Sequence, residues 1–356
     1  MKTLVILLGL AATAAAQTRA VKQEGPAPRP DKASLKTKGS PGPVEVQVRV
    51  GSEVAIDDNI LELNNRQISI LEDGTNTARF KIDDPGDVVY SVWADFRLKG
   101  RLFKEPTSAG LKVQPYVYQD SSIANYEEYE LFLHQDLGAH KAGFELGLER
   151  DVYLRELNRG GGNWESAFYD EYDLGIFYEH RVHPRATLRG TFGWLIRDYE
   201  SPWGARDREG AYVALEPEVD LGRGWRAFAR YEYSDQEAGA SDFEADTSYV
   251  QHEIEVGAAV ELIEKRLELA LKYRFGAREY TTRNDPLNDP SHVDREDDRH
   301  RLVFAVKVKL GKGWTADARW EYRDIDSDRP FDTSPLTDEP GDSTRHVFAL
   351  GVSFSL

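Results

Sequence analysis

The sequence of 356 residues contains no cysteine and no apolar run of 18 or more residues. The lack of cysteine excludes disulfides, thiolate metal sites and a lipid anchor on a cysteine behind a signal peptide. Without a long apolar run, no segment is expected to cross a membrane as a helix. A net charge of −17 argues against nucleic acid as a partner.

Recognisable catalytic motifs are also missing. The sequence has no G-x-S-x-G, H-E-x-x-H or glycine-rich phosphate loop. His134 and Asp136 stand two residues apart on one face of a predicted strand, a spacing that allows an acid–base pair. No serine-nucleophile motif or metal constellation accompanies them. We therefore predict neither an enzymatic activity nor a cofactor.

What the sequence does have is a regular alternation from residue 44 to residue 356. About fourteen segments alternate apolar and polar residues, as in Val44, Val46, Val48 and Val50. Tight turns such as Gly311-Lys312-Gly313 alternate with long polar loops. A secreted β-sandwich also alternates, but this many strands of similar length exceed an ordinary sandwich. The pattern predicts an all-β fold, an antiparallel transmembrane β-barrel of about fourteen strands with short periplasmic turns and long extracellular loops.

The segments before the barrel have a different composition. Residues 1–16 are predicted to be a signal peptide, with Lys2 before an apolar core and Ala14-Ala15-Ala16 as the cleavage site. Residues 17–43 are rich in proline and lysine and poor in apolar residues. They are predicted to form a flexible periplasmic leader, because such a segment cannot bury a core.

Aromatic residues recur at both ends of two predicted strands. Trp225 and Trp314 follow tight turns in two similar stretches of sequence, and Tyr233 and Tyr322 end those stretches. Aromatic residues of membrane barrels concentrate at the two membrane interfaces. These four residues are therefore predicted to belong to the interface girdles.

The polar faces of the predicted strands carry ordered charges. Acidic and basic faces follow one another, and opposite charges on neighbouring strands attract. Two interpretations stay open: the charges line a water-filled pore that selects polar or charged solutes, or they neutralise one another and only keep the lumen wet. The residues predicted to line the lumen are Asp173, Glu179, Arg185, Arg189, Glu216, Glu218, Asp220, Arg226, Arg230, Glu253, Glu255, Lys272, Arg274, Lys307 and Lys309.

Two further segments could affect such a lumen. The first long loop, residues 57–86, is too apolar for a purely solvated loop, so it either folds inward over the mouth or extends the flanking strands. Asp324, Asp326 and Asp328 form a carboxylate cluster with oxygen ligands suited to calcium, as do the acidic residues at 294–298. Neither cluster has the glycine and distal glutamate of an EF-hand loop, and a solvated acidic loop is the favoured interpretation.

The C-terminal segment Phe348-x-Leu350-x-Val352-x-Phe354-x-Leu356 resembles the closing strand of bacterial outer-membrane β-barrels. This chain has Leu356 where that superfamily usually ends in an aromatic residue. The resemblance implies the outer membrane of a Gram-negative bacterium, contact with its lipid and lipopolysaccharide, and recognition of the last strand by the barrel assembly machinery.

Residues 54–59 are similar to barrels associated with exopolysaccharide export or surface-lipoprotein assembly, which implies an envelope export complex as a partner. Two hypotheses follow. The first is an outer-membrane pore or transporter for polar solutes or polysaccharide. The second is a non-conducting barrel in an envelope assembly or export complex, with the lysine-rich leader as its periplasmic contact.

Overall fold

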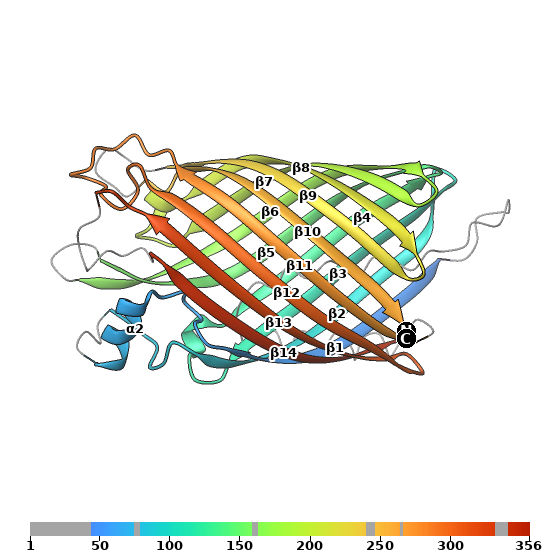
Figure 1. Cartoon of the computed structure of the whole chain (residues 1–356), viewed down its shortest axis with the longest axis horizontal. Coiled ribbons are helices and arrows are strands. Elements are labelled where there is room, and N and C mark those ends of the chain that lie inside the picture. The colour runs from blue at the N-terminus through green and yellow to red at the C-terminus, as the bar shows by residue number, and fades with distance from the viewer. Residues whose placement is uncertain (1–43, 75–78, 159–162, 240–245, 264–265, 332–340) are drawn as a thin grey trace.

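The chain forms a single closed barrel. The computed structural model describes residues 44–74, 79–158, 163–239, 246–263, 266–331 and 341–356. In that part of the chain, fourteen antiparallel strands pair in sequence order, and β1 (Glu45–Asp57) closes the barrel against β14 (Ser343–Ser355) (Figure 1). The predicted antiparallel barrel of about fourteen strands is confirmed. The predicted signal peptide and leader, residues 1–43, lie outside the described residues.

The strands have between 12 and 20 residues. A tilted strand needs about 9–11 residues to cross a bilayer, so these strands also extend beyond it. None of the helices in the described ranges is long and apolar enough to cross a membrane. The other elements are β2 (Asp87–Leu102), β3 (Glu105–Tyr118), β4 (Tyr126–Leu137), β5 (His140–Asn158), β6 (Trp164–His183), β7 (Ala186–Tyr199), β8 (Arg208–Gly222), β9 (Trp225–Ala238), β10 (Tyr249–Leu262), β11 (Leu267–Tyr280), β12 (Glu296–Gly311), β13 (Trp314–Asp328), the helix α2 (Asn65–Glu72) and the 3₁₀ turns η1 (Ser122–Ala124) and η2 (Gly204–Arg206).

The two ends of the barrel differ in their connections. Tight turns gather at one end, and longer loops with α2 gather at the other (Figure 1). In the turn from β12 to β13, Gly311, Lys312 and Gly313 have φ angles of 94°, 51° and 84°. A Cβ atom on Gly313 would lie 2.5 Å from the carbonyl oxygen of Ser355. Glycine is therefore required at position 313, both by the backbone conformation and by the close approach of β14.

The wall has two chemically distinct faces. Along β12, Phe304 and Leu310 are exposed at even positions, and the same holds for Phe348 and Leu350 along β14. The intervening positions carry mainly polar or small side chains and are more buried. Because side chains alternate along a strand, the apolar set covers the outside of the barrel and the other set faces the lumen.

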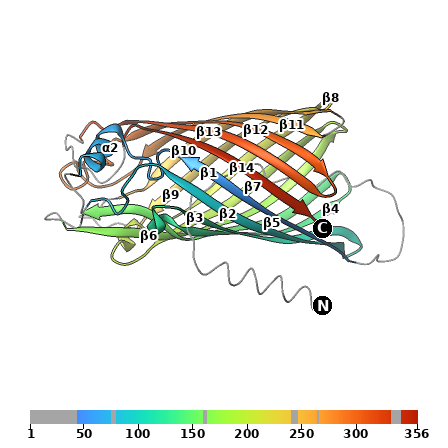
Figure 2. The same cartoon turned by 90° about the horizontal axis from the view of Figure 1, so that it is seen from below.

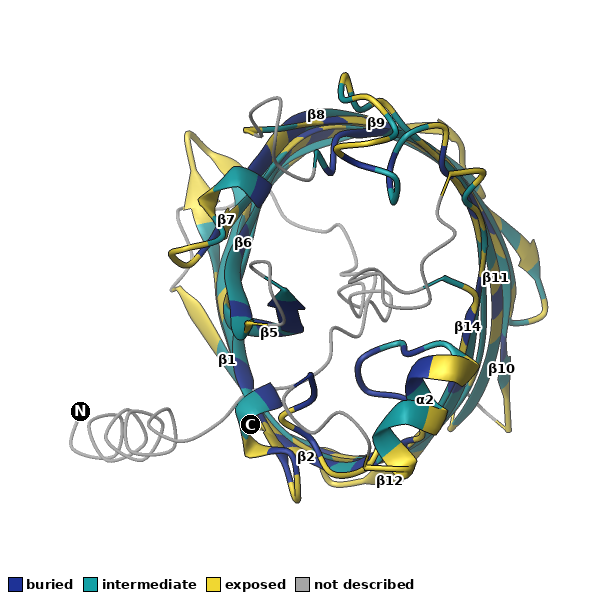
Figure 3. Ribbon diagram, turned by 90° about the vertical axis from the view of Figure 1, so that its left-hand side faces the viewer, coloured by how far each residue is buried: buried dark blue, intermediate teal, exposed yellow. Residues whose placement is uncertain are grey.

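The first long loop folds into the mouth of the barrel. It contains α2, whose N-cap Asn64 and Gln67 form a reciprocal capping box. Viewed along the barrel, α2 lies inside the ring of strands (Figure 3), and Figure 2 shows it at the end that bears the longer loops. Leu61 and Leu63 of this loop are buried with inner-wall residues such as Tyr116 and Val347. Of the two interpretations of residues 57–86, inward folding is the one the structure shows.

Candidate functional site: the charged lumen and the loop that enters it

Fourteen of the fifteen predicted lumen residues lie on the strands β6 to β12, at positions that alternate with outward-facing ones. Arg185 is the exception, and the prediction that it lines the lumen is wrong. It lies in the turn between β6 and β7 and is exposed, because β7 begins only at Ala186. Its carbonyl accepts a hydrogen bond from the backbone N–H of Asp220, which ties two neighbouring turns together.

The charged side chains form ion pairs across the wall. Arg274 of β11 contacts both Glu255 and Glu253 of β10, at 2.7 Å and 3.1 Å. Lys272 lies 3.5 Å from Glu255. Opposite charges on adjacent strands stabilise a sheet by roughly 0.2–1 kcal/mol per pair. The predicted alternation of acidic and basic faces thus corresponds to real contacts on β10 and β11.

Other arginines reach past their nearest strand. Arg189 of β7 lies opposite Glu216 in the strand register, but its guanidinium binds Glu145 of β5 at 2.6 Å. It passes over the ring of Phe177 on the intervening strand β6, 3.8 Å from the ring centroid. Arg226 likewise binds Glu268, two strands away, at 3.0 Å. Because arginine is long, register alone does not determine which carboxylate it pairs with.

The spacing of His134 and Asp136 allowed an acid–base pair, but the side-chain partner of His134 in the structure is Glu145. His134 contacts Glu145 at 3.0 Å through its Nε2 atom, and Glu145 also binds Arg189. His134 and Asp136 lie two residues apart on β4, which extends their spacing to about 6.6 Å along the strand. His134 therefore belongs to the polar network of the wall.

A row of four arginines crosses β11 to β14. Arg274 lies opposite Arg301, Arg301 opposite Arg323, and Arg323 opposite Arg345. Like charges directly opposite one another destabilise a sheet, so the row needs counter-charges. Arg323 and Arg345 were not among the predicted lumen residues, although the alternation of β13 and β14 already placed both on the inner face.

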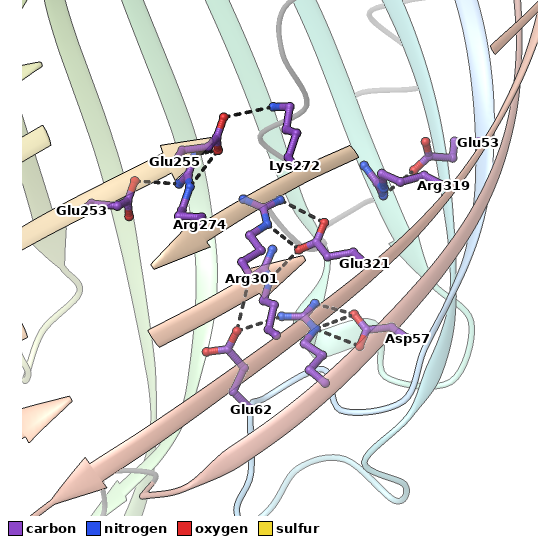
Figure 4. Close-up of polar contacts among 12 residues, drawn as sticks. Glu53, Asp57, Glu62, Glu253, Glu255, Lys272, Arg274, Arg301, Arg319 and Glu321 are labelled. Atoms are coloured by element: carbon purple, nitrogen blue, oxygen red, sulfur yellow. Dashed lines mark hydrogen bonds and ion pairs between the residues drawn. The ribbon is translucent and has the colours of Figure 1, made fainter. Parts of the chain in front are cut away.

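Glu253 and Glu255 face Arg274, and two further wall carboxylates serve the other three arginines. Glu321 accepts hydrogen bonds from Arg301 at 2.9 Å and from Arg323 at 2.5 Å. Asp57, at the end of β1, accepts one from Nε of Arg345 at 2.9 Å. Figure 4 shows Asp57 and Glu321 converging on guanidinium groups from neighbouring strands. The barrel closure between β1 and β14 is what brings Asp57 to this row.

A third carboxylate comes from the inward-folded loop. One oxygen of Glu62, which Figure 4 labels, lies 3.2 Å from Arg323 and 3.3 Å from Arg345. The backbone of Glu62 has a φ of 52°, in the left-handed region that favours glycine. Burial alone would raise the pKa of Glu62, but Arg323, Arg345 and Arg299 outweigh burial and lower this pKa to about 2.

Hydrogen bonds fasten the same loop to the wall. Asn59 donates from Nδ2 to the carbonyls of Leu63 and Thr344, at 2.8 Å and 2.9 Å, and its Oδ1 accepts from the Leu63 N–H at 2.8 Å. Arg155 of β5 donates to the carbonyl of Leu61 at 3.0 Å. The loop is therefore held on two sides of the barrel, at β14 and at β5.

The residues predicted for the interface girdles lie on the outer face. Trp225 and Trp314 are exposed at the starts of β9 and β13, beside the tight turns. Tyr233 and Tyr322 lie further along the same strands, each with its ring against a histidine of the next strand, His252 and His346. Partly polar aromatic rings at both ends of the apolar belt are typical of barrels that span a membrane.

The interpretation of Asp324, Asp326 and Asp328 as an acidic loop is wrong. All three belong to β13 and share its outer face. Successive members are about 6.6 Å apart, because two residues of a strand span that distance, so their carboxylates do not converge. Across the described ranges, no three His, Cys, Asp or Glu side chains are grouped so that they could hold a metal ion.

These features define the class of the protein. Only a fully closed barrel satisfies every backbone hydrogen bond of a sheet within lipid. An apolar outer face with aromatic ends and a charged interior are the marks of barrels in the bacterial outer membrane. The chain is therefore a closed, membrane-spanning β-barrel of the kind found in the bacterial outer membrane.

No protein-family model matches the sequence, and no curated protein matches it. Among solved structures, the outer membrane channel DcaP of Acinetobacter baumannii has a TM-score of 0.46 at 12% identity, over 91% of this chain and 100% of that chain. OmpTdeltaL8, a loop-deletion mutant of an outer membrane protein of Vibrio cholerae, gives 0.45 at 9%, over 88% and 99%. An anion-selective porin from Comamonas acidovorans gives 0.43 at 9%, over 88% and 99%. At TM-scores below 0.5, these likenesses carry no argument about what this chain does.

Proposed function

We propose that the barrel is a pore or transporter for polar solutes or polysaccharide. The observation that carries this proposal is the charged inner wall of β6 to β12, where ionised side chains pair with one another instead of giving way to an apolar core. Eight-stranded barrels are filled by their own side chains, whereas barrels of 16–18 strands leave an aqueous channel. Fourteen strands enclose more space than the filled class.

The inward loop supports a constricted path rather than a wide one. Its apolar residues pack on the inner faces of β1 to β5 and β14, since Ile60 and Leu63 belong to one buried cluster with Ala55, Tyr116 and Val347. The charged wall of β6 to β12 lies outside this apolar cluster. In this proposal, solutes pass along that charged wall.

The inward loop also favours a second candidate function. A loop that is buried against the wall and fastened at Asn59 and Leu61 suits a barrel that stays closed. Such a barrel would serve an envelope assembly or export complex without conducting. Contacts with lipopolysaccharide and with the barrel assembly machinery, through β14, belong to both proposals.

Conductance of the purified protein in a planar bilayer separates the two functions. The wild type should conduct, and a variant with residues 60–83 replaced by a short glycine–serine linker should conduct more. Combined reversal of Arg189, Arg226 and Arg230 to glutamate should shift the reversal potential across a salt gradient toward cation selectivity, since charges along a pore act directly on passing ions. Absence of conductance in both the wild type and the linker variant would refute the pore and favour the assembly role.

A further inference from the structure

The row of arginines that crosses β11 to β14 has a further arginine beside it. Arg299 of β12 also acts on Glu62, so it adds a further positive charge next to the row. The group at the loop, here termed the arginine cluster, therefore holds four guanidinium groups and three carboxylates: Arg299, Arg301, Arg323 and Arg345 with Asp57, Glu62 and Glu321.

The three carboxylates are not equivalent. Asp57 and Glu321 belong to strands, and their side chains are each 1% exposed. Glu62 belongs to the loop, and its side chain is 24% exposed. Its two ion pairs, at 3.2 Å and 3.3 Å, are also longer than the 2.5 Å contact of Glu321 with Arg323. Glu62 is therefore the carboxylate that another anion could replace most easily.

The backbone of Glu62 supports the same conclusion. A left-handed φ of 52° at a residue other than glycine persists only where surrounding contacts enforce it. Its backbone N–H donates to the Asn59 carbonyl at 3.1 Å, and its carboxylate contacts Arg323 and Arg345. Release of the carboxylate would remove the side-chain contribution to this conformation, and the hydrogen bonds of Asn59 would still anchor the loop nearby.

We propose that the arginine cluster is a binding site for the carboxylate of an anionic polar solute, and that Glu62 occupies the site until such a solute displaces it. Planar guanidinium groups bind carboxylates through paired hydrogen bonds, and the place of the solute is already taken by the carboxylate of Glu62. This inference rests on the proposed function, because the solute must reach the lumen. It names the class of solute as one that carries a carboxylate.

Calorimetric titration of the detergent-solubilised barrel with glucuronate, and with glucose as the neutral counterpart, tests the site without requiring conductance. Glucuronate should bind more tightly than glucose. Glu62→Gln should raise the affinity for glucuronate at least fivefold, because the resident competitor is gone. Glu72→Gln, which removes an exposed carboxylate from α2 in the same loop, should leave the affinity at the wild-type value.

A second substitution tests the arginines. Arg323→Gln in the Glu62→Gln background should lower the affinity at least fivefold again. If that double variant does not fold, as judged by heat-modifiable migration on gels, the comparison of Glu62→Gln with Glu72→Gln decides alone. Equal affinities of these two variants, or equal binding of glucose and glucuronate, would overturn the inference. Absence of conductance in both the wild type and the linker variant would refute the proposed function and leave the binding result intact.

Discussion

Single residues decide how the barrel tolerates a row of like charges. Arg301 and Arg323 face each other across β12 and β13, and the carboxylate of Glu321 lies between them with 1% of its side chain exposed. Removing one partner of such a buried pair leaves the other charges uncompensated, which costs far more than the pair contributes. Glu321 is therefore the residue on which this part of the wall depends most.

Glu321→Gln should destabilise the barrel by about 3 kcal/mol, because two guanidinium groups lose their shared counter-charge. Urea-induced unfolding in lipid vesicles measures the change. Glu279→Gln, at an exposed position on the outer face of β11, is the matched control and should stay within about 0.5 kcal/mol of the wild type. Equal stability of the two variants would show that Glu321 does not compensate the row.

The loop carboxylate predicts a pH dependence. The pKa of Glu62 is lowered from an ordinary value near 4.5 to about 2, so the folded state holds the proton less tightly than the unfolded state. The stabilisation from Glu62 is fully present above pH 4.5 and is lost as the pH falls toward 2. Thermal unfolding of the wild type and Glu62→Gln should therefore differ at pH 6 and converge by pH 2. A difference that is independent of pH would contradict this account.

Among the elements, the loop of residues 58–86 is the one that departs from a simple barrel. A loop exposed at the rim would need no buried apolar residues, yet Leu63 is 1% exposed and Phe80 and Ile82 are buried with it. Burial of such side chains is worth about 1.5–3 kcal/mol each. Together with the hydrogen bonds of Asn59, this burial explains why the loop stays in the mouth instead of extending β1 and β2.

Leu63→Ala should loosen the loop without unfolding the strands. The cavity left by the side chain costs about 3 kcal/mol of local packing, which raises the population of the open loop. Trypsin should then cleave faster after Arg66, Arg79 or Lys81, while heat-modifiable migration of the barrel persists. Ser69→Ala, at an exposed position of α2, should be cleaved at the wild-type rate. Unchanged cleavage of Leu63→Ala would mean that the loop is held by its polar contacts alone.

At the scale of the whole molecule, two features matter most for its place in a membrane: the closure of the barrel and the difference between its two ends. Pairing of β1 with β14 removes every free sheet edge, which lets the wall sit in lipid. The tight turns at one end and the longer loops at the other define a direction across the membrane (Figure 1). Barrels of the outer membrane place their short turns in the periplasm.

Cysteine labelling tests that orientation, and the natural absence of cysteine makes single-site labelling clean. Leu287→Cys in the loop before β12 and Phe103→Cys in the turn between β2 and β3 are the positions to use, since these residues are 94% and 84% exposed. On intact cells an impermeant maleimide should label only Leu287→Cys. Phe103→Cys should react after the outer membrane is permeabilised. The reverse pattern would invert the topology.

The architecture followed from the sequence because its determinants are local. A period of two residues places one apolar face on each strand, and a slip of one residue would turn every side chain to the wrong side. The glycines on either side of Arg223 and of Lys312 mark turns, because these turns need positive φ angles that glycine adopts readily. The same alternation placed Lys272, Arg274 and most of the other predicted lumen residues. The alternation misplaced Arg185, which lies in the turn between β6 and β7. It also did not show that β13 continues through Asp324 to Asp328.

Only the tertiary structure determined which charges meet. The pairing of Arg189 with Glu145 spans two strands, and the meeting of Glu62 with Arg323 and Arg345 joins the first loop to the last two strands. Both depend on the curvature and closure of the barrel, which no local pattern encodes. The inward folding of the loop also depends on closure, because its apolar residues are buried only where β1, β3 and β14 already stand around them. Alternation therefore predicts the wall, and the closed ring decides what the wall encloses.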